Sequence, residues 1–183
     1  MSPPQGKLLH ILALSIGARR VLEIGTLGGY STIWMARALP NDGELITIEI
    51  DPKHAEVAAQ NVERAALSKI VRVEVGDARK ILPQIASKGG AFDLIFIDAD
   101  KASIPEYFDW ALRMSHKGSL IIIDNVVREG AVIDESSDDA SVKGVRRLNE
   151  ILASEKRVSS TVIQTVGVKG YDGLAVALVL ADQ

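Results

Sequence analysis

The sequence predicts an α/β fold in which a mostly parallel sheet has helices on both faces and an antiparallel hairpin at its C-terminal edge. Short β-branched apolar runs alternate with amphipathic segments of helical length from Arg20 to about Ala153. This alternation is typical of parallel strands joined by crossover helices. Most of the runs are almost entirely apolar, as strands covered on both faces are.

Each element follows from the local pattern of apolar and turn-forming residues. We expect strands over 20–24, 44–50, 71–75, 92–97 and 119–124. We expect helices over 7–16, 30–39, 52–66, 78–86, 104–114 and 141–153. The hairpin consists of strands over 158–164 and 174–181, and the glycine-rich stretch 167–173 is interpreted as a long turn between them.

Two helix starts carry capping signals. Asp51 precedes Pro52, an arrangement in which the carboxylate caps the helix and the proline occupies its first position. Ser103 and Glu106 flank Pro105 with the spacing of a capping box.

Composition narrows the class of protein. A chain of 183 residues fits one domain, and 47% hydrophobic with 25% charged residues is ordinary for a soluble globular protein. The net charge is -3 and basic residues occur in pairs, which argues against nucleic-acid binding. The absence of cysteine excludes disulfides, thiolate catalysis and sulfur-ligated metals. We find no leader and no membrane-length apolar stretch, and therefore expect a cytoplasmic protein without a membrane partner.

Ligands of open α/β sheets bind beyond the carboxyl ends of the strands, so residues at strand ends matter most. The first expected strand leads into a loop with Gly25, Gly28 and Gly29, which permit a tight turn and a close backbone approach by a cofactor. A plain strand-to-helix turn would also use them. The spacing differs from the Gly-x-Gly-x-x-Gly of dinucleotide sites.

Acidic residues follow the next two strands. Glu49 can accept hydrogen bonds from both hydroxyls of a ribose, as acidic residues in nicotinamide-binding folds also do. Asp77 can accept from an adenine amino group, or it can cap the helix that follows; both roles can hold.

Three of these strand-end segments resemble those of a known family. Residues 21–31 (VLEIGTLGGYS), 47–51 (TIEID) and 76–78 (GDA) are similar to the class I S-adenosylmethionine-dependent methyltransferases. Within them, the chain most resembles the small cation-dependent O-methyltransferases related to catechol and caffeoyl-CoA O-methyltransferases. The resemblance runs from about Pro4 to Leu180. It implies a seven-stranded Rossmann-like sheet whose antiparallel strand comes from the terminal hairpin.

The resemblance also implies cofactor contacts. It assigns Gly25 and Ser31 to the methionine part of S-adenosylmethionine, Glu49 to the ribose, and Asp77 with Ala78 to the adenine. The two strand-end acids Glu23 and Asp98 complete the expected set of cofactor-binding residues.

Two further strand ends indicate a metal. Because adjacent parallel strands lie about 4.8 Å apart, Asp98 and the pair Asp124 and Asn125 can converge on one point. Two carboxylates and an amide oxygen suit Mg²⁺, with Mn²⁺ or Ca²⁺ possible, and leave positions for two substrate oxygens and a water. Each residue alone could be an ordinary polar cap. Asp100 is interpreted as a loop residue.

A divalent cation would help a chelating diol to lose a proton, and the oxygen could then attack the sulfonium methyl group. Lys101 lies three residues after Asp98, where a neighbouring cation and partial desolvation would lower its pKa and suit it as general base. The resemblance implies the same role, and Asp98 and Lys101 are therefore the expected catalytic residues. The resemblance further implies that the substrate is a small aromatic vicinal diol.

Other residues carry weaker expectations. His10, His54 and His116 show no ligand spacing and are interpreted as structural or surface residues. The acidic segment from Arg128 to Asp139 is expected to be a mobile loop, either solvated or a substrate lid.

Family members carry a further N-terminal segment that helps to cover the acceptor site and to form a homodimer, whereas this chain starts near the matching stretch. A homodimer is still expected. Two alternatives remain: a cofactor-binding module with little or no catalysis, and a nicotinamide-dependent oxidoreductase.

Overall fold

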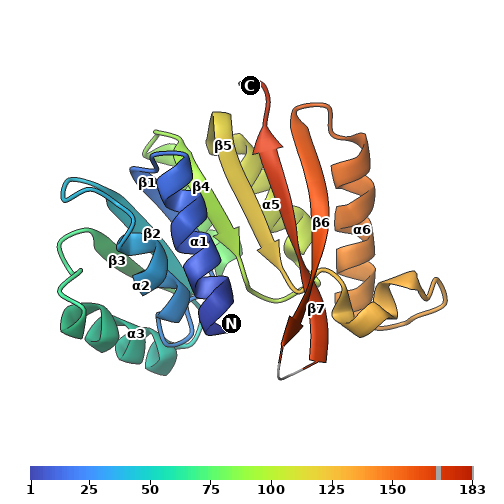
Figure 1. Cartoon of the computed structure of the whole chain (residues 1–183), viewed down its shortest axis with the longest axis horizontal. Coiled ribbons are helices and arrows are strands. Elements are labelled where there is room, and N and C mark those ends of the chain that lie inside the picture. Colours follow the sequence, from blue (N-terminus) through green and yellow to red (C-terminus); the bar gives the residue numbers. More distant parts are fainter. Residues whose placement is uncertain (168–169, 183) are drawn as a thin grey trace.

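The computed structural model describes residues 1–167 and 170–182, and within them seven strands form one sheet (Figure 1). The strands are β1 (Arg20–Ile24), β2 (Glu44–Glu49), β3 (Val71–Val75), β4 (Phe92–Ile97), β5 (Ser115–Asp124), β6 (Val158–Gly167) and β7 (Gly170–Val179). Their order is β3-β2-β1-β4-β5-β7-β6. The strands from β3 to β5 are parallel, and β7 is antiparallel to both β5 and β6. The predicted mixed sheet is confirmed.

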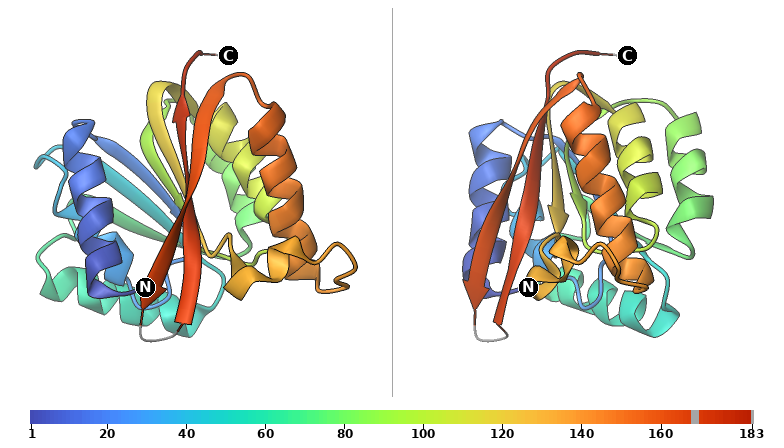
Figure 2. Two further views of the ribbon diagram at one scale, coloured as in Figure 1. Left: turned by 45° about the vertical axis from the view of Figure 1, so that its right-hand side comes forward. Right: turned by 90° about the vertical axis from the view of Figure 1, so that its right-hand side faces the viewer.

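Helices cover both faces of the sheet. They are α1 (Pro3–Ser15), α2 (Tyr30–Ala36), α3 (Pro52–Arg64), α4 (Ala78–Ser87), α5 (Ile104–Arg113), the 3-10 helix η1 (Arg128–Ile133) and α6 (Ala140–Ser154). The right-hand view of Figure 2 shows α1, in blue, on one side of the sheet and α5 and α6, in yellow-green and orange, on the other. No helix in the described part of the chain is long and apolar enough to cross a membrane.

The core follows from the alternation of side chains along the central strands. Val21 and Phe96 point to the face covered by α1 and α2, where they join a cluster with Leu9 and Met35. Leu22 points to the other face, into the cluster that α4, α5 and α6 complete. Because strands such as β1 are buried on both faces, their apolar runs are nearly continuous.

The strand order reverses at β1. The chain builds β1, β2 and β3 outwards in one direction and then crosses back to place β4 on the other side of β1. A crevice forms beyond the carboxyl ends of the strands at such a switch point, so β1 and β4 mark the expected ligand site.

One of the two predicted helix caps is confirmed. Asp51 accepts from the backbone N–H groups of Lys53 and His54 at the start of α3. The capping box at Ser103 is wrong, because the Ser103 side chain makes no capping hydrogen bond. Its backbone N–H donates instead to Asp100, so a residue of the preceding loop fixes this helix start.

The first helix begins earlier than expected. Ser2 and Gln5 form a reciprocal capping box, with Pro3 and Pro4 in the first turn, so α1 starts four residues before the predicted 7–16 segment. The structural reason is that both prolines and the box satisfy or remove the unpaired N–H groups of a helix start.

The C-terminal hairpin is longer than expected. β6 and β7 pair from Val158 and Val179 to Gly167 and Gly170, so most of the stretch expected to be a long turn is strand. Val168 and Lys169 lie outside the described residues. In Figure 1 the hairpin extends beyond the carboxyl ends of β4 and β5, on the side where the N-terminus lies. The segment 128–139, expected to be a mobile loop, contains the 3-10 helix η1 in its first half, and its mobility stays a prediction.

His116 and Asp93 form an ion pair near the amino ends of β1 and β4. The His116 ring lies 2.9 Å from Asp93 Oδ1, and Asp93 Oδ2 accepts from the backbone N–H groups of Arg19 and Arg20. The hydrogen bond to Asp93 is the main cause that raises the pKa of His116 above its ordinary value of 6.5. Burial alone would raise the pKa of Asp93. The hydrogen bonds from the N–H groups of Arg20 and Arg19 and from His116 outweigh burial, so the pKa of Asp93 is lowered.

We predict that His116→Gln destabilises the protein more at pH 5.5 than at pH 8.5. A raised pKa contributes stability that is present below the unfolded value and lost as pH rises through the folded value. Because both side chains are partly exposed, the pH-dependent part should be about 0.2–1 kcal/mol. Urea unfolding at the two pH values measures it, with His10→Gln as control. A difference that does not change with pH would contradict the prediction.

Candidate active site

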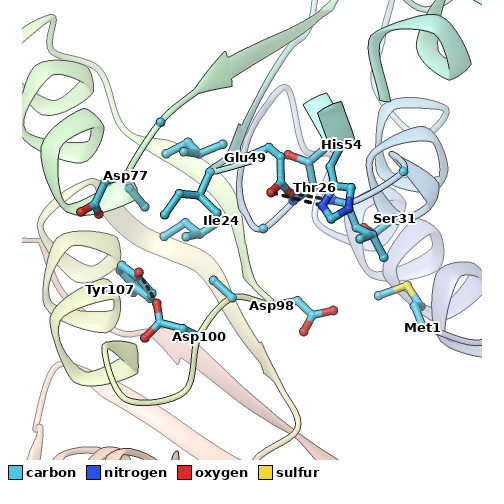
Figure 3. Close-up of a pocket in the computed structure, with 18 of the residues that line it drawn as sticks. Met1, Ile24, Thr26, Ser31, Glu49, His54, Asp77, Asp98, Asp100 and Tyr107 are labelled. Atoms are coloured by element: carbon cyan, nitrogen blue, oxygen red, sulfur yellow. Dashed lines mark hydrogen bonds and ion pairs between the residues drawn. The ribbon is translucent and has the colours of Figure 1, made fainter. Parts of the chain in front are cut away.

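A cavity of about 610 Å³ lies beyond the carboxyl ends of β1, β2 and β4 (Figure 3). Six of the predicted cofactor-binding residues line it: Gly25, Ser31, Glu49, Asp77, Ala78 and Asp98. The structure therefore brings together residues from four separate loops of the sequence. Four predicted site residues do not line this cavity: Glu23, Lys101, Asp124 and Asn125.

Gly25 is required by a close approach of two strand ends. A Cβ at this position would lie 2.1 Å from the carbonyl oxygen of Asp98, and φ is +98°. The Gly25 N–H donates to Ile48 and the Asp98 N–H donates to Ile24, so the loops after β1 and β4 are tied to neighbouring strands. The sequence suggested room for a cofactor, whereas the tightest contact is with the protein's own backbone.

Glu23 lies behind the cavity wall. Its side chain is wholly buried and accepts hydrogen bonds from the hydroxyl groups of Ser31, Thr32 and Thr47, the last at 2.6 Å. Ser31 lines the cavity, so its hydrogen bond connects Glu23 to the cavity wall. Since its proton goes to Glu23, the Ser31 oxygen presents lone pairs, not a donor, to a bound molecule.

Burial shapes the electrostatics of Glu23. It raises the pKa of the carboxyl group from 4.5 to about 7, and the charge of Asp98 adds to the effect. The three hydroxyl hydrogen bonds oppose it. A carboxylate that needs three donors to remain buried is sensitive to any change in this cluster.

Glu49 is held by backbone amides. Its Oε2 accepts from the N–H groups of Thr26 and Leu27, at 3.2 and 2.7 Å, and its Oε1 accepts from Asp51 at 3.0 Å. His54 Nδ1 lies 3.8 Å from Oε1. The glycine-rich loop and the end of β2 are thus joined through one carboxylate that faces the cavity (Figure 3). His54, interpreted from sequence as a structural or surface residue, also lines the cavity.

Asp77 has the capping role that the sequence left open. It accepts from the Arg79 N–H at the start of α4 and pairs with the Arg79 guanidinium at 2.7 Å. These hydrogen bonds lower the pKa of Asp77. Asp77 still lines the cavity, on the same side as Asp100, which accepts from the Tyr107 hydroxyl at 2.6 Å (Figure 3). Asp100, interpreted from sequence as a loop residue, and Tyr107 both line the cavity, because the turn at 98–103 brings them to this wall.

The predicted catalytic and metal residues lie at the ends of β4 and β5. Lys101 Nζ lies 3.2 Å from Asp98 Oδ1, and the Lys101 side chain is only 9% exposed. Asp124 is buried, and burial together with the charge of Asp98 raises its pKa to about 6. Asn125 follows in a left-handed conformation, with φ of +60°, and its N–H donates to Asp124 Oδ1.

The donor set consists of two carboxylates and an amide. Within residues 1–167 and 170–182, no group of three or more His, Cys, Asp or Glu is arranged to hold a metal ion. In the same residues, no hydrogen bond engages the side-chain amide of Asn125. Gly144 of α6 packs on the adjoining loop, where a Cβ would lie 2.1 Å from the Lys101 carbonyl oxygen. The position of Lys101 therefore depends on a glycine 43 residues away in α6.

Comparison with known proteins gives the family. A family model described as O-methyltransferase matches residues 1–180. A catechol O-methyltransferase of Niastella koreensis is 55% identical over 180 residues, which are 98% of this chain and 81% of that protein. A catechol O-methyltransferase of Mycobacterium tuberculosis is 50% identical over 98% of this chain and 80% of that protein.

Solved structures agree. The O-methyltransferase TomG from Streptomyces achromogenes, in complex with S-adenosylmethionine, is 53% identical with a TM-score of 0.97, over 99% of this chain and 82% of that one. An O-methyltransferase from Bacillus cereus in complex with S-adenosylhomocysteine is 55% identical with a TM-score of 0.96, over 98% of this chain and 82% of that one.

The fold and the cavity define a class I methyltransferase, and the chain belongs to the O-methyltransferase family. It is an enzyme that uses S-adenosylmethionine to methylate an oxygen atom. The nicotinamide-dependent alternative and the non-catalytic module are therefore not retained.

We predict that Glu23→Gln removes a pH-dependent part of the stability. The raised pKa of Glu23 means that its contribution is fully present below about pH 4.5 and is lost as pH rises through about 7. The wild type should lose on the order of 3 kcal/mol relative to the variant across this range. Urea unfolding between pH 4.5 and 8 tests this, with the exposed Glu56→Gln as control. Parallel pH curves for Glu23→Gln and the wild type would disprove it.

Proposed function

We propose that the enzyme is a divalent-metal-dependent O-methyltransferase that methylates one hydroxyl of a catechol-like vicinal diol. The observation that carries this proposal is the group of oxygen donors from Asp98, Asp124 and Asn125 at the ends of the adjacent strands β4 and β5. Carboxylate and amide oxygens are the ligands that Mg²⁺, Mn²⁺ and Ca²⁺ prefer.

The electrostatics of the two carboxylates support a cation. Burial and the charge of Asp98 raise the pKa of Asp124 to about 6, and Lys101 lies against Asp98. A divalent cation shared by the two carboxylates would offset the repulsion that the charge of Asp98 exerts on ionised Asp124. Three protein donors also leave coordination positions for two oxygens of a diol.

The reaction breaks an O–H bond and the bond between sulfur and the methyl carbon, and it forms a bond between oxygen and that carbon. When bound, the cation supplies positive charge that favours loss of the hydroxyl proton. We assign Lys101 Nζ to accept this proton, because it is buried against Asp98 beside the proposed cation, whose positive charge would favour the neutral amine that can act as a base. Fixing both reactants in line is worth up to roughly 7–11 kcal/mol in ideal cases.

The cavity residues are assigned to the methyl donor. Gly25 and Ser31 face its methionine part, Glu49 its ribose hydroxyls, and Asp77 with Ala78 its adenine. Ser31, held as an acceptor by Glu23, suits the ammonium group of the methionine part. Glu23 is a positioning residue in this proposal, and Asp98 serves both the donor and the metal.

The acceptor class is supported by relatives named catechol O-methyltransferase at 50–55% identity. A homodimer is part of the proposal. Apolar side chains of the hairpin such as Ile163, Leu178 and Leu180 are 39–50% exposed and offer surface for a second copy.

We predict that EDTA abolishes methyl transfer and that Mg²⁺ restores it. Asp124→Asn should lower kcat/KM about a hundredfold or more, because a metal contributes several kcal/mol of charge stabilisation. Binding of S-adenosylhomocysteine, measured by calorimetry, should change little. Asp138→Asn, at a side chain that is 99% exposed, is the control. Full activity in excess EDTA would refute metal dependence.

We predict that vicinal diols are methylated and that matched monophenols are not, since only two adjacent hydroxyls can chelate one cation. Transfer of labelled methyl from S-adenosylmethionine to catechol, caffeate and phenol, with and without Mg²⁺, makes the comparison. Equal rates on catechol and phenol would show that the acceptor need not be a vicinal diol. They would not contradict the assignment as an O-methyltransferase.

A further inference from the structure

Asp172, at the start of β7, accepts hydrogen bonds from three backbone amides. Its Oδ1 lies 2.9 Å from the nitrogen atoms of Val127, Arg128 and Gly173. Two of these donors are about 45 residues away, in the turn that leaves β5. One carboxylate oxygen of the hairpin therefore holds the turn that follows Asp124 and Asn125.

The turn that Asp172 holds is strained. Asn125, Arg128 and Glu129 have φ values of +60°, +53° and +54°, in the left-handed region that residues other than glycine rarely adopt. Such conformations persist only where the surrounding structure imposes them, and they cluster at functional sites. We refer to residues 125–130 as the strained turn.

The rest of β7 supports the same turn. The Val126 N–H donates to the Gly173 carbonyl at 3.1 Å, and the Tyr171 hydroxyl donates to the Glu129 carbonyl at 2.6 Å. Gly173 allows this approach, since a Cβ there would lie 2.5 Å from Val127 Cγ2. The contacts cover both ends of the strained turn.

Asn125 lies between two fixed points. Before it, Asp124 pairs with Leu174 in the antiparallel ladder of β5 and β7. After it, Val126 and Val127 are bound to Gly173 and Asp172. The direction of the Asn125 side chain is thus set by a backbone that β7 holds on either side.

We propose that Asp172 is a positioning residue for metal binding, which it serves by holding the strained turn so that the Asn125 amide faces the carboxylates of Asp98 and Asp124. This inference rests on the proposed metal site. Asp172 acts through hydrogen-bond geometry, so a neutral side chain with an acceptor oxygen in the same place suffices.

The test measures Mn²⁺ binding by calorimetry in the presence of S-adenosylhomocysteine. Asp172→Ala should weaken Mn²⁺ binding about 10–100-fold, as loss of an outer support of a metal ligand does. Asp172→Asn should stay within about threefold of the wild type, because its amide oxygen can accept the same N–H groups. The affinity for S-adenosylhomocysteine without metal should be equal in all three proteins.

Two further variants keep the test decisive. Asp139→Ala removes the aspartate that caps α6 without touching the strained turn, and should bind Mn²⁺ like the wild type. If Asp172→Ala does not fold, Tyr171→Phe removes the hydrogen bond to Glu129 and should weaken Mn²⁺ binding in the same direction.

The outcomes separate the two proposals. Unchanged Mn²⁺ affinity in Asp172→Ala, or equal losses in the alanine and asparagine variants, overturns the positioning role and leaves the metal site standing. Absence of Mn²⁺ binding by the wild type overturns the metal site itself, and the role of Asp172 with it.

Discussion

The close approach of the strand ends of β1 and β4 is the constraint on which the site depends. Gly25 meets the Asp98 backbone so tightly that no Cβ fits between them. This contact lies at the reversal of the strand order, where the crevice of an α/β sheet forms. It brings the glycine-rich loop, which borders the cavity, against the acidic end of β4. The proposed donor and acceptor regions are adjacent because these two backbones touch.

The protein compensates its buried carboxylates by different means. Glu23 is surrounded by the hydroxyls of Ser31, Thr32 and Thr47, and Glu49 by backbone amides of the glycine-rich loop. Each of these two carboxylates has three donors from the protein. In the described residues Asp98 and Asp124 have one donor each, from Lys101 and from the Asn125 N–H. Of these four carboxylates, the two proposed to hold a cation are therefore the ones with the fewest protein donors.

The antiparallel hairpin contributes to the site as well as to the edge of the sheet. β7 pairs with β5 up to Asp124, and its first residues hold the turn beyond it. From sequence, the stretch containing Tyr171, Asp172 and Gly173 is interpreted as a long turn, because glycines are frequent in it. Its pairing with β6 and its hydrogen bonds to the strained turn are contacts between distant segments, which local patterns do not encode.

The sequence by itself determined the order of strands and helices, the mixed sheet, and the acidic and glycine residues at strand ends, because periodicity and turn chemistry are local properties. Six expected residues share one cavity, since parallel strands end at one edge. Only the tertiary structure decided that Glu23 lies behind Ser31 and that Tyr107 and His54 reach the cavity. It also decided that Asp100 holds the Ser103 N–H and that Gly144 packs on Lys101. These depend on which segments pack together, and the packing of distant backbones leaves no periodic signal in the chain.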